Sequence, residues 1–462
     1  MKSESNTFID YAFAKAFSGD THDDEVVSFL RELLKSARDG HLYLHSHTIN
    51  GKINNLIIGD NSPIVAYNDC YYLRRNWEIE ENIATHLHRI NKAKSPYNFF
   101  VKQDNSLSEE QQKALSLSMS KCLTLITGGP GCGKTYLAKK IIETFLQFNS
   151  DAHIIIGAPT GRAANNLAYK DTTFGTLHAL LGLRDTFYKE SGVKPLIGDL
   201  IIIDECSMID INLWSLLLAA IPSSTHLVLI GDPHQLPPVE SGALFHYICK
   251  IESIPQINLT KTMRTKSTSI DNLAKLVKDG EADKALSCLE NSTCDEIRLS
   301  SLNHIPIPQN LQACILTPFC KGTFGTQECN KYIDNILNEN ERPIIITKND
   351  YHLNLLNGEI GATTKEMAMF KEKTFPLSLL LSYELAYAIS VHKSQGCEFD
   401  NVIILLPEGS EIFGREMLYT AITRAKKTVT IYSNKTTFLQ IVSHVTYQNS
   451  NLVEKFKLLN LQ

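Results

Sequence analysis

The sequence lacks the features that mark a membrane, secreted or strongly basic protein. No apolar run approaches the ~20 residues of a membrane span. The start, MKSESNTFID, does not show the charged-then-apolar pattern of a secretory signal. The formal net charge is −5, so a general basic coat for gripping nucleic acid is absent. Any contact with nucleic acid must be confined to a local groove. We therefore expect a cytoplasmic protein without membrane contact.

Cysteine pairs with the spacing of a metal site are also missing. The chain has eleven cysteines, and no two of them have the C-x-x-C spacing of a zinc or redox site. An odd number of cysteines without such pairs favours reduced thiols in the cytosol. Hydrophobic residues make up 43% of the chain and charged residues 21%, which is typical of a globular protein. The 462 residues are too many for one core and predict two or three domains.

The patterns along the chain distinguish three regions. Residues 1–100 contain two helical segments and one alternating segment but no chemical motif, so we expect a docking or support domain. From about residue 101, apolar strands alternate with helices, first over residues 101–250 and again over residues 251–462. This alternation predicts the α/β class, with two units that each have a mostly parallel sheet covered by helices on both faces.

The segment GGPGCGKT, Gly128–Thr135, follows an apolar strand and precedes a helix. It satisfies the pattern G-x-x-x-x-G-K-[ST], in which backbone N–H groups and a helix N-terminus surround phosphate oxygens. Lys134 would bind the β and γ phosphates, and the Thr135 hydroxyl would bind Mg²⁺. A chance glycine-rich turn is the alternative, but it leaves the flanking strand and helix unexplained. The residues expected at the nucleotide are Gly128, Gly129, Pro130, Gly131, Cys132, Gly133, Lys134 and Thr135.

A second apolar strand, in LIIIDECSM, ends in the acids Asp204 and Glu205. Because ligands of open α/β sheets lie at the carboxyl ends of the strands, we expect these acids beside the phosphate loop. Asp204 would hold Mg²⁺, and Glu205 would orient or deprotonate the attacking water. The alternative is a strand that simply ends in surface acids. Together with the loop, the pair predicts hydrolysis of ATP or GTP and argues against a small-molecule kinase.

Three further residues suggest how hydrolysis produces movement. Gln235, in GDPHQLPPVESG, follows an apolar strand and is placed to sense the γ-phosphate. Arg264, in LTKTMRT, and Arg424, in YTAITRAKK, belong to the second α/β unit. Two arginines that reach the γ-phosphate across a cleft would close it only when the triphosphate is bound. We therefore expect a cleft that closes on ATP and opens on ADP.

The order of the motifs resembles that of superfamily 1 helicases, and their wording is similar to the RecD family. The match covers about residues 105–435 and consists of LSEEQQKAL, GGPGCGKT, APTGRAA, TLHALLG, DECSM, GDPHQLPPV, LTKTMRT, HKSQGCEFDNVI and REMLYTAITRAKK. The resemblance implies two RecA-like P-loop NTPase domains with parallel sheets, a small, mostly helical N-terminal domain and a short SH3-like insertion at residues 345–382. It also implies a strand-separating pin at residues 183–195, where a plain hairpin loop is the alternative.

Further site residues follow from the resemblance alone. Gln111 would recognise adenine, and Gly396 and Glu398 would lie near the nucleotide, with Glu398 on the ribose. Arg264 and Arg424 would be the arginine fingers. For the residues expected at DNA, an ordinary loop or helix-cap role is the alternative. Single-stranded DNA would be contacted by Thr160, Arg162, Thr176, His178, His392 and Lys393.

The resemblance implies a DNA helicase that uses ATP and Mg²⁺ to move 5′ to 3′ on single-stranded DNA. In this interpretation the chain is the alpha subunit of exodeoxyribonuclease V (RecBCD), which acts in double-strand break repair and recombination. Its partners would be RecB-like and RecC-like subunits and single-stranded or tailed double-stranded DNA. No nuclease constellation is found, so cutting would belong to another subunit. The alternatives are a stand-alone RecD-like helicase and a non-translocating ATP-binding assembly subunit. A P-loop kinase would leave Arg264 and Arg424 unexplained.

Overall fold

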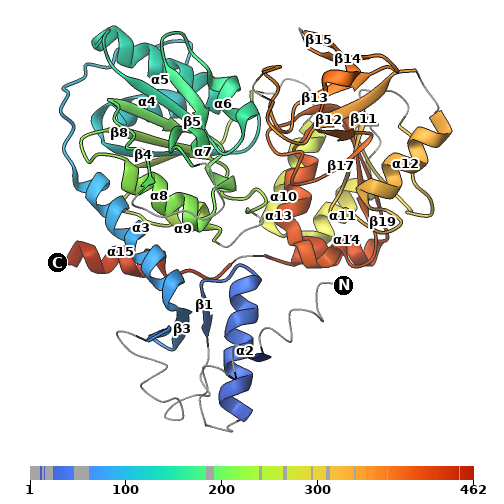
Figure 1. Cartoon of the computed structure of the whole chain (residues 1–462), viewed down its shortest axis with the longest axis horizontal. Coiled ribbons are helices and arrows are strands. Elements are labelled where there is room, and N and C mark those ends of the chain that lie inside the picture. Colours follow the sequence, from blue (N-terminus) through green and yellow to red (C-terminus); the bar gives the residue numbers. More distant parts are fainter. Residues whose placement is uncertain are drawn as a thin grey trace.

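A computed structural model shows two α/β units side by side, with a small N-terminal region beneath them (Figure 1). The structure describes residues 11–12, 15, 24–45, 62–183, 192–238, 242–263, 268–292, 295–308, 313–337, 340–350, 352–371, 373–446 and 448–461. Within these ranges, every helix is too short or too polar to traverse a bilayer.

The N-terminal region combines helices with a small antiparallel sheet. Its strands are ordered β1-β3-β2. The elements are α2 (Asp24–Arg38), β1 (Tyr43–His45), β2 (Ile64–Tyr67), β3 (Cys70–Leu73) and α3 (Arg74–Lys92). The apolar face of α2 packs Phe29, Leu30 and Leu33 against Ile64 and Tyr71 of the sheet. Helix α3 leaves this region and packs on the first α/β unit, so the region is anchored to that unit.

The first unit is a six-stranded parallel sheet with the order β6-β5-β7-β8-β4-β9. Its strands are β4 (Leu123–Gly128), β5 (Ile154–Ala158), β6 (Thr173–Thr176), β7 (Leu200–Ile203), β8 (His226–Gly231) and β9 (Gln256–Leu259). Its helices are α4 (Glu109–Ser120), α5 (Lys134–Phe148), α6 (Gly161–Leu167), α7 (Leu177–Leu180), the 3-10 helix η2 (Cys206–Met208), α8 (Ile211–Ala220) and α9 (Leu244–Ile248).

Side chains of the first sheet alternate between two cores, one on each face. Ile154 and Ile156 of β5 pack in the core formed with α4 and α5. Ile155, between them, packs in the core formed with α3, α8 and α9. Because both faces are covered, the strands read as continuous apolar runs, as expected for a parallel sheet.

The second unit is a five-stranded parallel sheet with the order β10-β19-β18-β11-β17. Its strands are β10 (Ile297–Ser300), β11 (Ala313–Thr317), β17 (Ala388–Ser390), β18 (Phe399–Leu406) and β19 (Ala425–Ser433). Its helices are α10 (Thr268–Asp279), α11 (Ala282–Glu290), α12 (Thr326–Leu337), the 3-10 helix η4 (Ser410–Phe413), α13 (Gly414–Ile422) and α14 (Lys435–Ser443). The predicted α/β class with two parallel sheets is confirmed.

A small antiparallel sheet, residues 342–385, interrupts the second unit at the place expected for the insertion, 345–382. Its strand order is β15-β14-β13-β12-β16, and it has its own apolar core. The elements are β12 (Arg342–Ile346), β13 (Ile360–Thr363), β14 (Met367–Phe370), β15 (Lys373–Pro376), the 3-10 helix η3 (Leu377–Leu379) and β16 (Tyr383–Leu385). In Figure 1 this sheet lies at the end of the second unit away from the N-terminal region.

The chain crosses between the units twice. Strand β9 lies beyond the expected domain boundary at residue 250, yet it is an edge strand of the first sheet. After α14 the chain returns, and helix α15 (Leu452–Leu461) packs on α3 and α9 of the first unit. The expected second domain, 251–462, therefore includes two elements that pack with the first unit. We propose domain limits that assign residues 448–461 and β9 to the first domain.

Candidate nucleotide and nucleic-acid sites

The phosphate loop connects the end of β4 to the start of α5. Gly131 and Gly133 have φ values of +79° and +78°, a left-handed conformation that side chains with a Cβ rarely adopt. A Cβ at Gly133 would also lie 2.6 Å from Gln111 Nε2. Glycine is therefore required at Gly133 both by the backbone and by the neighbouring side chain. The turn exposes backbone N–H groups at the N-terminus of a 15-residue helix, which is a suitable site for an anion.

Lys134 lies against its own loop. Its Nζ donates to the carbonyl oxygens of Gly128 (2.6 Å) and Gly129 (2.8 Å). The ammonium is thus held beside the loop amides, where phosphate oxygens compete for the same protons. Thr135 follows in the first turn of α5 and is exposed. Its hydroxyl is accessible to a cation bound next to the phosphates.

Gln111 lies behind the loop, and the two ends of its side-chain amide differ in their contacts. Its Oε1 accepts from Ser108 N (3.0 Å), and its backbone N donates to Ser108 Oγ (3.2 Å), which forms a capping box for α4. Within the part of the chain that the structure describes, its buried Nε2 makes no hydrogen bond. A buried, unpaired amide is costly unless something accepts from it. This position beside Gly133 is consistent with the predicted contact to a base.

The two acids occupy unusual environments at the end of β7. Asp204 is 8% exposed and its Oδ1 accepts from Glu205 N at 2.8 Å. Burial raises the pKa of Asp204 to about 7, and the Glu205 carboxylate contributes to the increase, while Lys134 opposes it. A bound divalent cation would lower this pKa and favour the carboxylate. Glu205 has φ 53° and ψ 41°, a left-handed conformation that is rare for glutamate and clusters at functional sites.

Gln235 lies in the loop that follows β8. Its side chain is buried, and Nε2 is 3.5 Å from Asp232 Oδ2. Its Oε1 has no hydrogen-bond partner among the described residues. The second unit reaches this loop, because Tyr419 OH donates to Asp232 Oδ2 at 2.8 Å. The same hydroxyl would lie 3.1 Å from a Cβ at Gly129, so it also borders the phosphate loop.

A cleft of about 490 Å³ lies between the phosphate loop and helix α10 of the second unit. Residues Gly128–Pro130, Asp232 and Tyr419 line it. Helix α10 contributes Lys275, Lys278 and Asp271 on the opposite side, so this wall carries charges of both signs. A site bounded by both units can respond to a nucleotide by changing the angle between them.

The structure describes only one of the two predicted arginine fingers, Arg424. Arg424 is 3% exposed and donates to Thr420 O and Cys397 O within its own unit, at 3.1 and 3.3 Å. Arg264 lies outside the described residues. The preceding residue, Met263, donates from its backbone N to Gly131 O at 2.8 Å.

Gly396 and Glu398 do not line the cleft. Gly396 has φ +72° and open space around it, which accounts for glycine there without a ligand. Glu398 is exposed and pairs with Lys426 at 3.3 Å. Of the expected pin, 183–195, residues 184–191 lie outside the described residues, so the pin stays a prediction.

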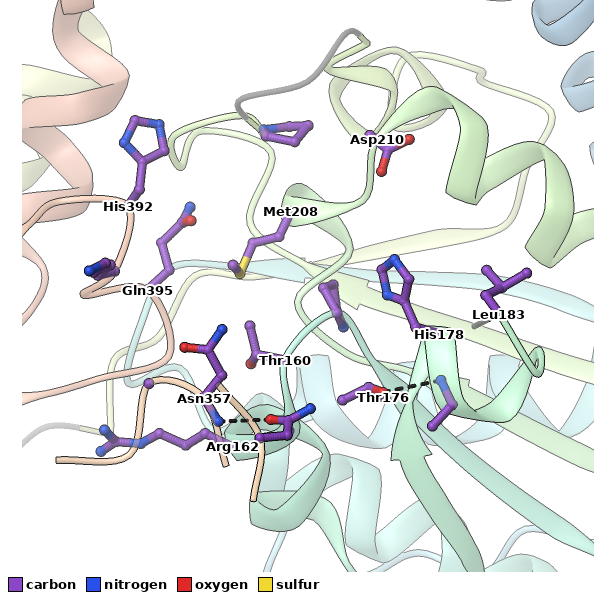
Figure 2. Close-up of a pocket in the computed structure, with 17 residues that line it drawn as sticks. Thr160, Arg162, Thr176, His178, Leu183, Met208, Asp210, Asn357, His392 and Gln395 are labelled. Carbon is purple, nitrogen blue, oxygen red and sulfur yellow. Dashed lines mark hydrogen bonds between the residues drawn. The ribbon is translucent and has the colours of Figure 1, made fainter. Parts of the chain in front are cut away.

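A groove of about 630 Å³ runs between the two units (Figure 2). Every residue predicted to contact DNA lines it, although they come from separate motifs in both units. They are Thr160, Arg162, Thr176, His178, His392 and Lys393. The structure thus brings together a set that the sequence alone left scattered.

The hydroxyls in this groove also have structural roles. Thr160 and Thr176 cap the helices α6 and α7, because their Oγ1 atoms accept from Ala163 N (3.3 Å) and Ala179 N (3.2 Å). Both threonines are therefore helix caps, and their contact with DNA stays a prediction. A hydroxyl that accepts in a cap keeps its proton, so each can still donate to a phosphate oxygen.

The charged groups of the groove are partly engaged by protein. Arg162 Nη1 donates to Cys397 Sγ of the second unit at 2.8 Å, and Lys393 Nζ pairs with Glu384 at 2.7 Å. Burial lowers the pKa of His392, so this ring is neutral at pH 7. Sequence reasoning missed other lining residues, including Met208 and Asn357, which Figure 2 shows facing the groove. Short polar motifs such as APTGRAA suggest contact with DNA. The methionine of DECSM does not, because a methionine is equally expected in an apolar core.

The fold and site define a class, the P-loop ATPases whose two α/β units enclose a nucleotide cleft and a separate groove. Two family models match the chain. One describes an AAA domain and matches residues 111–241, and the other describes a UvrD-like helicase C-terminal domain and matches residues 385–432. The first contains the phosphate loop and both acids, and the second contains Arg424.

Curated relatives identify the family within this class. The RecBCD enzyme subunit RecD of Mycolicibacterium smegmatis is 30% identical over 443 residues, which cover 81% of this chain and 80% of the relative. The RecBCD enzyme subunit RecD of Buchnera aphidicola subsp. Acyrthosiphon pisum is 29% identical over 517 residues, covering 86% and 84%. The chain belongs to the RecD family. It is an ATP-dependent DNA helicase.

Solved structures of Pif1 helicases share the fold. The Pif1 helicase from Candida albicans matches with a TM-score of 0.51 and 18% identity, covering 77% of this chain and 99% of that one. Bacteroides Pif1 bound to ssDNA matches with a TM-score of 0.50 and 19% identity, covering 72% and 94%. At this identity the likeness concerns the arrangement of the two RecA-like domains.

Proposed function

We propose that this chain is a RecD-type subunit of a RecBCD-like enzyme, with RecB-like and RecC-like partners. In this role it would pull single-stranded DNA 5′ to 3′ during double-strand break repair. The coverage of curated RecD subunits, 80% or more of their length, supports the subunit role. The polarity comes from the resemblance to the family. The groove that gathers all six predicted DNA contacts is the observation on which the DNA role rests.

Each residue predicted at the nucleotide has a proposed task. Lys134 and the loop amides bind the β and γ phosphates, and Gln111 Nε2 donates to the base. Glu205 orients the attacking water and accepts its proton. Asp204 and Thr135 fit Mg²⁺, because one supplies a buried carboxylate and the other an accessible hydroxyl. When bound, Mg²⁺ would neutralise charge that develops on the phosphates.

The groove supports binding that does not depend on sequence. Its donors are hydroxyls, imidazoles, side-chain amides, one lysine and the Arg162 guanidinium, which suit phosphate and sugar oxygens. Met208 and Leu183 add apolar surface on which bases can pack. Because the groove is walled by both units, a change in the cleft angle alters the spacing of the DNA contacts. Successive rounds of ATP binding and hydrolysis would therefore move the strand.

A stand-alone helicase remains the second candidate, because one relative supports it. The ATP-dependent RecD2 DNA helicase of Deinococcus radiodurans is 31% identical over 354 residues, but the match covers only 49% of that protein. Purification from the native source separates the two. Two large co-purifying subunits support the complex, and a chain that unwinds DNA without partners supports the alternative.

The motor role is tested by ATP hydrolysis with and without single-stranded DNA. DNA should stimulate turnover in the wild type. Glu205→Gln should lower DNA-stimulated kcat roughly 100-fold or more, while DNA binding is retained. Glu252→Gln, an exposed acid of the same unit outside both cavities, is the matched control. Absence of DNA-stimulated turnover in the wild type, alone and with co-purifying subunits, would refute the motor and favour an assembly role.

A further inference from the structure

The loop that carries Gln235 is held by the second unit as well as by its own. We call residues 232–236 the sensor loop. Leu236 N donates to Thr420 Oγ1 at 2.7 Å, and Leu236 O accepts from Gln395 Nε2 at 2.8 Å. Tyr419 OH donates to Asp232 Oδ2 at 2.8 Å. Three side chains of the second unit thus form hydrogen bonds with a loop that belongs to the first unit.

The Tyr419 contact differs from the other two because it involves a charge. Asp232 is buried, and its carboxylate needs donors to remain there. Tyr419 is also buried, at 5% exposure, and burial together with Asp232 raises the pKa of its hydroxyl. The hydroxyl therefore keeps its proton at neutral pH and donates it. Hydrogen bonds to ionised acceptors are roughly twice as strong as neutral ones.

Gln235 shares this carboxylate with Tyr419. Its Nε2 lies 3.5 Å from the same Oδ2 that accepts from Tyr419, at the limit of a hydrogen bond. Its Oε1 has no partner within the described ranges. The amide is thus oriented by Asp232 and has a free acceptor. Asp232 Oδ1 accepts from His234 N of its own loop at 3.1 Å, so it is Oδ2, the oxygen nearest Gln235, whose position depends on a hydroxyl of the second unit.

We propose that Tyr419 is a positioning residue for ATP hydrolysis. Its hydroxyl holds Asp232, which lines the nucleotide cleft, and Asp232 orients the buried Gln235 amide next to it. The sensing group is then in place only when α13 of the second unit lies against the phosphate loop, beside Gly129. This inference rests on the proposed motor function. It adds a route by which closure of the two units is communicated to the hydrolysis site.

Tyr419→Phe tests the proposal, since it removes the hydroxyl and keeps the ring. DNA-stimulated kcat should fall about tenfold, whereas KM for ATP and the affinity for single-stranded DNA without nucleotide should change less than about twofold. Tyr432→Phe, in β19 of the same unit and outside both cavities, is the matched control and should behave as wild type. If Tyr419→Phe lowers the melting temperature, Asp232→Asn provides a second test. It keeps the side-chain volume and should cause the same loss of DNA-stimulated kcat.

A double variant separates positioning from a general loss of packing. If Tyr419 acts through Gln235, then adding Tyr419→Phe to Gln235→Ala should cause no further loss of kcat. Losses that multiply, or a Tyr419→Phe enzyme with the kcat of wild type, would overturn the proposal and leave the motor function intact. A wild-type chain without DNA-stimulated hydrolysis, with or without co-purifying subunits, would overturn both.

Discussion

A buried ion pair between Lys455 and Glu80 joins helix α15 to helix α3. Lys455 Nζ lies 3.1 Å from Glu80 Oε2, and the two side chains are 6% and 0% exposed. Glu80 Oε1 also accepts from Ser450 Oγ (2.6 Å) and Asn451 N (2.9 Å). Lys455 Nζ donates to the backbone oxygen of Trp77 (3.0 Å) and lies 3.4 Å from the centre of the Trp77 indole ring. The pair therefore ties α15 to α3, on the side of the first unit to which the chain returns after α14.

Lys455→Met should destabilise this junction by about 3–5 kcal/mol, because it leaves the Glu80 carboxylate buried without a cation. Glu80→Gln combined with Lys455→Met removes both charges and should recover most of that loss. The exposed neighbour Lys457→Met should change stability by less than about 0.5 kcal/mol.

Hydrogen exchange of the α15 amides measures this junction directly. The single variant should raise the exchange rates over residues 452–461, and the melting temperature should fall by roughly 6–20 °C. Protection that is unchanged in Lys455→Met, or a double variant as unstable as the single, would refute the reasoning.

Three further outcomes follow from the sites. Gln111→Ala should raise KM for ATP about tenfold and narrow the preference for ATP over GTP in steady-state assays, because a buried donor to the base is lost. Gly133→Ala should weaken ATP binding about tenfold in titrations, since φ +78° strains alanine, whereas Gly192→Ala meets open space and should not. Burial lowers the pKa of His246 to about 4. The unfolded chain binds this proton first, so stability is lost as pH falls from about 6.5 towards 4, and His246→Gln should reduce that loss in denaturation by on the order of 2 kcal/mol. Three results would contradict these expectations. They are equal changes in KM for ATP and GTP in Gln111→Ala, equal ATP affinities of Gly133→Ala and Gly192→Ala, and the same dependence of stability on pH in His246→Gln and wild type.

Local physics explains why the phosphate loop and both sheets could be predicted from the sequence. Gly131 and Gly133 predict the turn of the phosphate loop, and the apolar run before Asp204 predicts the end of a buried strand. These signals depend on neighbours in the chain. The residues that line the groove were expected only from the resemblance to the RecD family, because no pattern along the chain shows that they lie together.

Contacts between the units could not be read from the sequence. Tyr419 and Asp232 are 187 positions apart, and Arg162 and Cys397 are 235 apart. No periodicity reports such pairs, since they depend on how two finished domains pack. The docking of α15 on α3 was missed for the same reason, because Lys455 reads as an ordinary surface lysine until Glu80 is found beside it. The roles of the site residues stay predictions.

ATP-driven unwinding of duplexes with a single-stranded 5′ or 3′ tail tests the central claim, that hydrolysis at the phosphate loop pulls one strand through the groove between the units. The account predicts unwinding of the 5′-tailed duplex, dependent on ATP and abolished by Glu205→Gln, with the 3′-tailed duplex left intact. No unwinding of either duplex by the chain with its co-purifying subunits, or unwinding that persists in Glu205→Gln, would contradict it.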